Sequence, residues 1–295
     1  MKNLKTNTNS TLHTPHSTLN LPSVSEMMRG AGLEPKKSLG QNFLFDLNLT
    51  RKIARSVPDL ENSVVLEVGP GPGGLTRALL ECGAKKVIAI EKDRAAMPIL
   101  EQIQAAAGGR LEVVLGDALK IKNYELRIKN YAVCANLPYN VGTELLIRWL
   151  HEPRITSMTL MFQREVAERI VAKPGSKQYG RLSVLAALGW RAKILFNVPN
   201  TAFVPPPKVQ SAVVQLVPLP GNGLVGRVSM KPGGEFHRNS PHQAVEKITA
   251  MLFGQRRKMI RSIMPGVDWA AFGLSGTERA EELSPEVFVR IAEVL

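Results

Sequence analysis

The sequence predicts an α/β protein in which a doubly wound, Rossmann-like sheet is followed by a small all-helical domain. Three observations lead to this prediction. Short apolar segments alternate with helical patterns from residue 63 to residue 162, the first apolar segment ends in a glycine-rich turn, and only helical patterns follow residue 240. Strands that alternate with helical patterns of about 10–15 residues form βαβ units and a mainly parallel sheet.

The predicted strands are short runs rich in β-branched and other apolar residues. We expect them at residues 63–68, 87–90, 111–115, 131–135 and 157–162, followed by 191–198 and 211–217 on either side of a proline-rich loop. Helices are expected at 75–82 and 94–107, because each apolar helical pattern there is ended by glycine, Gly83 in one case and Gly108 in the other.

The chain divides into four predicted segments. Residues 1–25 are rich in Thr, Asn, Ser and His and lack the apolar core of a secretory signal, so we expect a disordered tail. Residues 26–217 form the sheet domain. Residues 218–240 are rich in proline and glycine and are expected to be a linker, and residues 241–295 form the helical domain.

The helical domain contains two long apolar patterns. One covers residues 243–264 and the other residues 284–295. The second pattern begins with Ser284 as the N-cap and Pro285 at the first helical position, the arrangement typical of a helix start.

The net charge of +13 and the sequence pI near 9.9 indicate a polyanionic partner, with nucleic acid more common than an anionic membrane. The charge is uneven: +4 in residues 1–60, +1 in 61–150, +6 in 151–219 and +2 in 220–295. A basic but solvated surface is the alternative interpretation.

Only two cysteines occur, Cys82 and Cys134, in apolar surroundings. We therefore expect that the protein is located in a reducing cytoplasm and that it has no disulfide and no metal site. No run reaches the ~18 apolar residues of a membrane span.

The glycine-rich turn after the first strand matches G-x-G-x-x-G with Gly69, Gly71 and Gly74. That pattern alone is weak support for a dinucleotide site. Pro70 and Pro72 have no backbone N–H, so the turn lacks two donors that a pyrophosphate would need. The turn suits a nucleoside cofactor without phosphates, and S-adenosylmethionine (SAM) is the leading candidate.

Acidic or amide residues stand at the ends of three consecutive strands. Glu91 can accept from two ribose hydroxyls, Asp117 can accept from an adenine amino group, and Asn136 ends the next strand. Each residue alone is more often a turn former or helix cap. Because ligands of open α/β sheets bind at the carboxyl ends of the strands, three such residues in succession predict one binding site.

The tetrapeptide Asn136-Leu137-Pro138-Tyr139 predicts a rigid turn that ends in an aromatic ring. Its simplest interpretation is a proline turn before a helix. The functional interpretation is a clamp for a planar amino group: the Asn136 amide oxygen and the Leu137 carbonyl accept from the NH₂, and Tyr139 stacks on the ring. Such a clamp acts by orientation and charge stabilisation.

The tetrapeptide is the amino-methyltransferase motif in its N-L-P-Y form, and together with other motifs it resembles the ribosomal RNA adenine N6-dimethyltransferases. The other motifs are K-S-L-G-Q-N-F-L at 37–44, E-V-G-P-G at 67–71, G-R-L-S at 180–183, F-V-P-P-P-K-V-Q-S at 203–211, F-G-Q-R-R-K at 253–258 and R-A-E-E-L-S at 279–284. The resemblance covers about residues 33–295 and is closest to the small-subunit branch of the family.

The resemblance implies a SAM-dependent methyltransferase domain and a set of site residues. Asn42 and Leu44 would close over SAM from the N-terminal arm, and Phe203 would pair with Tyr139 to hold a target adenine that has left its stack. The residues implied for the cofactor are Gln41, Asn42, Leu44, Gly69, Gly71, Glu91, Lys92, Asp117, Ala118 and Asn136, and those implied for catalysis are Asn136, Leu137, Pro138, Tyr139 and Phe203.

The resemblance also implies a substrate: two adjacent adenosines near the 3′ end of small-subunit ribosomal RNA, dimethylated late in the assembly of the subunit. Residues expected to contact RNA are Arg181, Lys208, Arg256, Arg257, Lys258 and Arg261. We expect a monomer that acts on immature small subunits, with no membrane and no metal involved.

Three alternatives stay open at this stage. The same chemistry could act on large-subunit RNA, as in antibiotic-resistance methylases. The chain could be a non-catalytic RNA-binding assembly or transcription factor on the same fold, although an intact N-L-P-Y turn argues against it. The third alternative, a nicotinamide-dependent dehydrogenase, is supported by the glycine pattern alone.

Overall fold

The computed structural model describes residues 18–36, 39–121, 128–222 and 241–294. Its strands are β1 (Phe43–Leu44), β2 (Val64–Val68), β3 (Lys86–Glu91), β4 (Leu111–Leu115), β5 (Tyr131–Asn136), β6 (Ile155–Gln163), β7 (Trp190–Val198), β8 (Phe203–Val204) and β9 (Ser211–Pro218). Its helices are α1 (Val24–Ala31), α2 (Leu47–Arg55), α3 (Gly74–Glu81), α4 (Met97–Ala106), α5 (Gly142–Leu150), α6 (Arg164–Val171), α7 (Arg181–Ala187), α8 (Pro241–Gly254), α9 (Ile260–Ile263) and α10 (Pro285–Val294).

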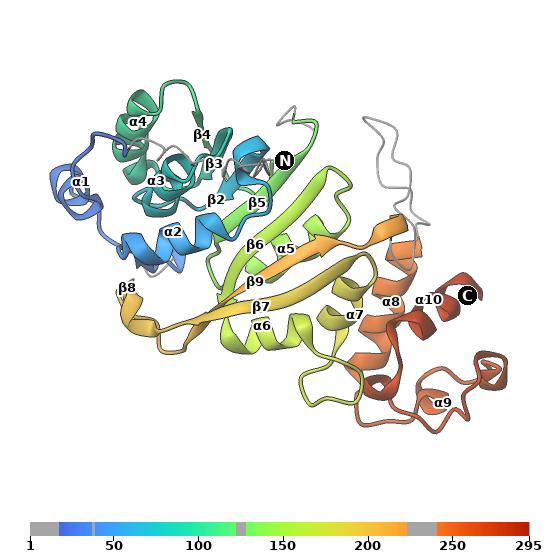
Figure 1. Cartoon of the computed structure of the whole chain (residues 1–295). Coiled ribbons are helices and arrows are strands. Elements are labelled where there is room, and N and C mark those ends of the chain that lie inside the picture. The colour runs from blue at the N-terminus through green and yellow to red at the C-terminus, as the bar shows by residue number, and fades with distance from the viewer. Residues whose placement is uncertain (1–17, 37–38, 122–127, 223–240, 295) are drawn as a thin grey trace, which may run out of the picture.

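Seven strands form one mixed sheet in the order β4-β3-β2-β5-β6-β9-β7 (Figure 1). The first five are parallel to one another, whereas β9 runs antiparallel to both β6 and β7. The predicted doubly wound, Rossmann-like sheet followed by helices is confirmed. The strands were recognisable because β2, β3 and β5 are buried on both faces and are therefore apolar along most of their length.

Helices cover both faces of the sheet (Figure 1). Apolar residues of α1, α2, α3 and α4 pack in one cluster with Ala132 and Cys134 of β5. Residues of α5, α6 and α7 pack on the opposite face with Tyr131 and Val133 of the same strand. Successive residues of a strand point to opposite faces, so β5 contributes to both cores.

A two-stranded ribbon lies outside the main sheet. β1 pairs with β8 in antiparallel register, Phe43 with Val204 and Leu44 with Phe203. The ribbon joins the N-terminal arm to the loop that connects β7 and β9, two parts of the chain that are far apart in the sequence. The sequence patterns did not predict this pairing because each strand has only two residues.

The predicted helix at 243–264 is wrong as a single element. α8 ends at Gly254, and the charged turn after it leads to Met259, whose backbone is extended and pairs with Arg279 in an isolated bridge. The short α9 follows. The helix predicted at 284–295 is observed as α10, beginning at Pro285. The division into domains at residues 217 and 241 stays a prediction.

The prediction of a disordered tail over residues 1–25 is wrong for residues 18–25. Ser23 caps α1 and forms a capping box with Glu26, Leu19 is buried, and the Pro22 carbonyl accepts a hydrogen bond from Arg77 at 2.5 Å. The capping signature Ser-x-x-Glu was present in the sequence before the apolar residues of α1. Residues 1–17 and most of the predicted linker, 223–240, lie outside the described residues.

The C-terminal helices pack on α7 and on the loop before it. The side chain of Tyr179 is 1% exposed, its hydroxyl donates to the Leu283 carbonyl at 2.9 Å, and its ring meets that of Phe253 edge to face. The N–H of Gly175 in the same loop donates to the Glu281 carbonyl at 2.7 Å. The loop at residues 173–180 is therefore a structural contact between the sheet and the C-terminal helices.

We expect Tyr179→Phe to lower the free energy of unfolding by about 1–3 kcal/mol, because the buried Leu283 carbonyl is left without its donor. Tyr131→Phe is the matched control. Tyr131 is equally buried, and its hydroxyl has no hydrogen-bond partner in the part of the chain that the structure describes, so its removal should leave stability unchanged or raise it. Urea unfolding measures both, and equal decreases in the two variants would contradict the assignment.

Candidate functional site

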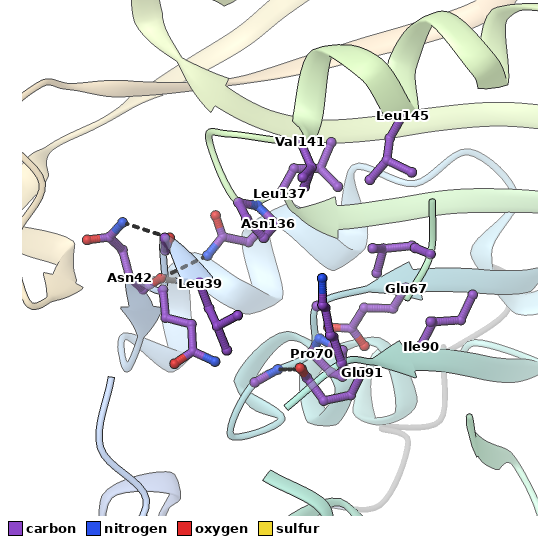
Figure 2. Close-up of a pocket in the computed structure, with 18 of the residues that line it drawn as sticks. Leu39, Asn42, Glu67, Pro70, Ile90, Glu91, Asn136, Leu137, Val141 and Leu145 are labelled. Atoms are coloured by element: carbon purple, nitrogen blue, oxygen red, sulfur yellow. Dashed lines mark hydrogen bonds between the residues drawn. The ribbon is translucent and has the colours of Figure 1, made fainter. Parts of the chain in front are cut away.

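A pocket of about 1160 Å³, counted with its open mouth, lies at the carboxyl ends of β2, β3 and β5 (Figure 2). This is the edge at which ligands of open α/β sheets bind. All ten residues predicted for the cofactor line it: Gln41, Asn42, Leu44, Gly69, Gly71, Glu91, Lys92, Asp117, Ala118 and Asn136. Leu137, Pro138 and Tyr139 line it as well, whereas Phe203 does not.

The glycine loop lies directly beneath the N-terminal arm. Gly69, Gly71 and Gly73 have φ angles of 71°, 54° and 80°, in the left-handed region that favours glycine. A Cβ on Gly71 would lie 2.8 Å from the Phe43 ring, and one on Gly74 would lie 2.7 Å from the Leu44 carbonyl oxygen. The glycines therefore also allow β1 to close over the loop, a role beyond the ligand approach that the sequence suggested.

Glu91 ends β3 with a buried carboxylate whose position is fixed by two backbone donors. Its Oε2 accepts from the N–H of Gly71 at 2.9 Å (Figure 2). Its Oε1 accepts from the N–H of Asp93 at 2.7 Å. Burial raises the pKa of Glu91, and the two hydrogen bonds oppose that rise. The remaining lone pairs of the carboxylate suit the two hydroxyls of a ribose, as the sequence predicts.

Glu67 is a second carboxyl group in the pocket lining, and it is 1% exposed. The pKa of Glu67 is raised to about 8, chiefly by burial. The hydrogen bond that Thr76 Oγ1 donates at 2.7 Å opposes this rise, and the nearby Glu91 adds to it. Glu67 is therefore protonated at neutral pH. The sequence patterns predicted no role for Glu67, although an acid within an apolar strand was a visible signal.

Asp117 and Lys92 form an ion pair at the other end of the pocket. Lys92 Nζ lies 2.8 Å from Asp117 Oδ2, and Asp117 Oδ1 accepts from the N–H of Leu119 at 3.0 Å. The hydrogen bond from Lys92 lowers the pKa of Asp117, so this carboxylate is ionised. A partly exposed pair of this kind is weak, so a ligand amino group can compete with Lys92 for the carboxylate.

Asp93 anchors the N-terminal arm, a role that the sequence patterns did not predict. Lys36 Nζ donates to Asp93 Oδ1 at 2.7 Å, and Gln41 Nε2 donates to its Oδ2 at 3.2 Å. Although burial raises the pKa of Asp93, these hydrogen bonds hold it below its usual value. The signal was an aspartate just before a helical pattern, and its side chain does cap η3 (Arg94–Ala96).

The turn at residues 136–139 presents its amide to the pocket in one orientation. Asn136 Nδ2 donates to the Asn42 carbonyl at 3.1 Å, which leaves the Asn136 amide oxygen to accept from a ligand (Figure 2). The arm therefore closes the pocket and also orients its amide acceptor. The arrangement can hold and orient an amino group, in line with the clamp that the tetrapeptide predicts.

The two aromatic residues implied for the target base lie in different surroundings. Tyr139 lines the pocket, and its hydroxyl lies 2.8 Å from Ser211 Oγ. Phe203 is 2% exposed; it pairs with Leu44 in the β1–β8 ribbon and packs in the core. The pairing of Phe203 with Tyr139 around a target base stays a prediction.

The basic residues predicted to contact RNA fall into two groups. Lys208, Arg257, Lys258 and Arg261 are exposed. Arg256, by contrast, is half-buried; it forms an ion pair with Glu281 and donates to the Lys177 carbonyl at 2.7 Å. Arg256 therefore holds the C-terminal helices against the loop before α7. Arg181 is exposed as well, and its guanidinium makes only a weak contact, 3.8 Å from a carboxylate oxygen of Glu246.

Within the described ranges, no cluster of three or more His, Cys, Asp or Glu residues has the geometry to hold a metal ion. No helix of these ranges is long and apolar enough to cross a membrane.

Comparison with known proteins identifies close relatives. The family model for ribosomal RNA adenine dimethylase matches residues 32–223. A protein of Chelativorans sp. (strain BNC1), named ribosomal RNA small subunit methyltransferase A, is 52% identical over 286 residues, which cover 92% of this chain and 97% of that protein. A protein of Ruegeria sp. (strain TM1040) with the same name is 50% identical, with 94% and 97% covered.

Solved structures show the same fold. A dimethyladenosine transferase from Plasmodium falciparum superposes with a TM-score of 0.67 at 25% identity, covering 84% of this chain and 95% of that one. The 23S rRNA methyltransferase ErmE gives a TM-score of 0.61 at 24% identity, with 85% and 98% covered.

The protonation of Glu67 predicts a pH dependence of stability. The unfolded chain releases this proton near the ordinary pKa of 4.5, whereas the folded chain keeps it up to about pH 8. Unfolding therefore releases a proton between these values, and stability falls as the pH rises from 4.5 to 8, by at most about 1.4 kcal/mol per pH unit.

Glu67→Gln removes this titration and keeps an acceptor for Thr76. We expect the difference in the free energy of unfolding, wild type minus variant, to decline from pH 4.5 to pH 8 and to be constant above pH 8. Urea unfolding at a series of pH values measures the difference. Parallel pH profiles for the two proteins would show that Glu67 is ionised in the fold.

Proposed function

This chain belongs to the ribosomal RNA adenine dimethylase family, and we propose that it transfers methyl groups from SAM to N6 of adenosines in small-subunit ribosomal RNA. The observation that carries the proposal is the N-L-P-Y turn, whose amide faces a pocket lined by every residue predicted for the cofactor. Relatives that share half of its residues along nearly the whole chain are small-subunit enzymes, whereas the large-subunit enzyme ErmE shares only a quarter.

The pocket suits SAM in its hydrogen-bonding groups and in its place at the carboxyl ends of the strands. Bound SAM supplies a methyl group that its sulfonium activates for transfer. Glu91 suits the ribose hydroxyls, Asp117 suits the adenine amino group, and the glycines of the loop carry no side chains that would obstruct the ligand. The arm residues Asn42 and Leu44 close this site from above.

The N-L-P-Y turn orients the acceptor amine. The Asn136 amide oxygen and the Leu137 carbonyl accept from the exocyclic NH₂ of the target adenine, and Tyr139 stacks on its ring. Neutral acceptors direct the nitrogen lone pair toward the methyl group and stabilise the positive charge that develops on N6. The hydrogen bond between Asn136 and Asn42 supports this assignment, because it fixes the amide.

We extend the proposal to the RNA substrate, the oligomeric state and the location of the enzyme. The substrate is a pair of adjacent adenosines near the 3′ end of small-subunit RNA within an immature subunit. Lys208, Arg257, Lys258 and Arg261 contact its phosphates, and the enzyme acts as a monomer in a reducing cytoplasm. The free cysteines and the exposed basic side chains support this setting.

The direct test is transfer of labelled methyl groups from SAM to immature small subunits that lack the modification, compared with mature small subunits and large subunits. We expect incorporation into the immature small subunits only. A folded, SAM-bound chain that labels none of the three would refute the proposed activity.

Asn136→Ala should lower kcat at least about 100-fold, because a fixed acceptor no longer stabilises the transition state. SAM affinity should fall by less than about tenfold, since only a single hydrogen-bonding group is removed. Asn140→Ala is the control: this residue also lines the pocket, and we give it no catalytic task. Turnover assays and SAM titrations measure the effects, and an Asn136→Ala enzyme with full activity would refute the clamp.

The two groups of basic residues should respond differently to alanine. Arg257→Ala and Lys258→Ala should weaken RNA binding and reduce the salt dependence of log Kd by roughly 0.7–0.9 for each RNA phosphate that is no longer neutralised, with stability unchanged. Arg256→Ala should chiefly lower stability, by about 0.5–1 kcal/mol, because it breaks the interactions with Glu281 and Lys177. Salt titrations and urea unfolding separate the groups, and a reversed pattern would contradict the division.

A further inference from the structure

We propose that Ser211 is a positioning residue for the methyl transfer, holding the Tyr139 ring in the plane on which the target adenine stacks. The inference rests on the proposed function, which gives the Tyr139 ring its task. It adds a residue from β9, two strands away from β5 at the same edge of the sheet, to the target-base site.

The hydrogen bond joins two parts of the chain that are 72 residues apart. Ser211 Oγ and Tyr139 Oη lie 2.8 Å from each other, within hydrogen-bond distance. Ser211 is 0% exposed, and Tyr139 is partly buried at the rim of the pocket. The polar end of the Tyr139 ring is therefore turned toward the sheet.

Ser211 is a rigid anchor because three strands fix its backbone. It is the first residue of β9, where it pairs with Gln163 at the end of β6 and with Val198 at the end of β7. Next to it, the Gln210 carbonyl accepts from the N–H of Arg164 at 2.9 Å. The hydroxyl of Ser211 is thus held at a point that belongs to the sheet.

Tyr139 has the opposite character, since it lies in the turn between β5 and α5. The N–H groups of Val141 and Gly142 bond to the Pro138 carbonyl, which fixes the backbone of the turn but not the ring. A hydrogen bond at Tyr139 Oη fixes the direction of the ring axis, which the χ1 torsion sets, because Oη lies at the far end of that axis. Without it, the ring can tilt out of the stacking plane.

The geometry assigns this restraint to the chemical step. Burial raises the pKa of Tyr139, so its phenol is neutral and its ring face keeps the electron density that attracts a cation. N6 of the adenine becomes positive as the methyl group arrives, so the ring plane matters most in the transition state. Small errors in position at this stage lower kcat more than they lower ground-state binding.

A double-mutant cycle tests the proposal with Ser211→Ala, Tyr139→Phe and the double variant. Each single change removes one partner of the same hydrogen bond, so each should lower kcat by roughly two- to tenfold. The double variant should be no slower than the slower single variant. SAM affinity and the KM for immature subunits should each stay within about twofold of wild type.

Ser157→Ala is the matched control, because Ser157 is a 2% exposed serine on β6 of the same sheet, away from Tyr139. It should keep the wild-type kcat. A Ser211→Ala enzyme with wild-type kcat would overturn the proposal, and so would effects of the two single changes that multiply in the double variant. If Ser211→Ala does not fold, Tyr139→Phe alone tests the proposal. A Tyr139→Phe enzyme with wild-type kcat would then overturn it.

A second readout does not need turnover. In a protein with labelled tyrosine, NMR three-bond couplings should show a single χ1 rotamer of Tyr139 in the wild type and averaging over rotamers in Ser211→Ala. Equal couplings in the two proteins would overturn the restraint. A wild-type chain that transfers no methyl group would count against the proposed function, whereas the χ1 comparison would still test the hydrogen bond.

Discussion

The pocket depends on how closely the arm at Phe43 and Leu44 lies over the glycine loop. Gly71 and Gly74 have no room for a side chain beneath β1, so the two segments meet at van der Waals distance. In that position the Asn42 carbonyl reaches Asn136, and Asp93 holds Gln41 and Lys36. The same loop supplies the N–H of Gly71 to Glu91. One steric constraint therefore fixes the positions of three groups together: the arm, the Glu91 carboxylate and the Asn136 amide.

The chemical groups of the site are divided by charge. Glu67 keeps a proton because it is fully buried, whereas Asp117 is ionised beside Lys92. The acceptors that we propose for the target amine, the Asn136 amide oxygen and the Leu137 carbonyl, are neutral, as suits a step that creates positive charge on nitrogen and needs orientation above all. The exposed basic residues that we propose for RNA binding lie elsewhere in the sequence, at Lys208 in the loop before β9 and in the turn after α8.

Most of the sheet and most of the pocket could be predicted from the sequence. The strands were visible because parallel strands buried on both faces are continuously apolar, and their end residues Glu91, Asp117 and Asn136 share one edge by topology. Contacts between distant segments left no local pattern. The β1–β8 ribbon, the anchor at Asp93 and the hydrogen bond between Tyr139 and Ser211 are of this kind. The helix predicted over 243–264 failed because an extended residue, Met259, pairs with Arg279 and breaks it.

We propose that this chain dimethylates N6 of adenosines in small-subunit RNA. Nucleoside mass spectrometry of RNA from immature small subunits, after incubation with the chain and SAM, tests the claim most directly. We expect N6,N6-dimethyladenosine, at two adjacent positions near the 3′ end of that RNA. Methyl groups found only on other atoms or other bases, or only in large-subunit RNA, would contradict the account.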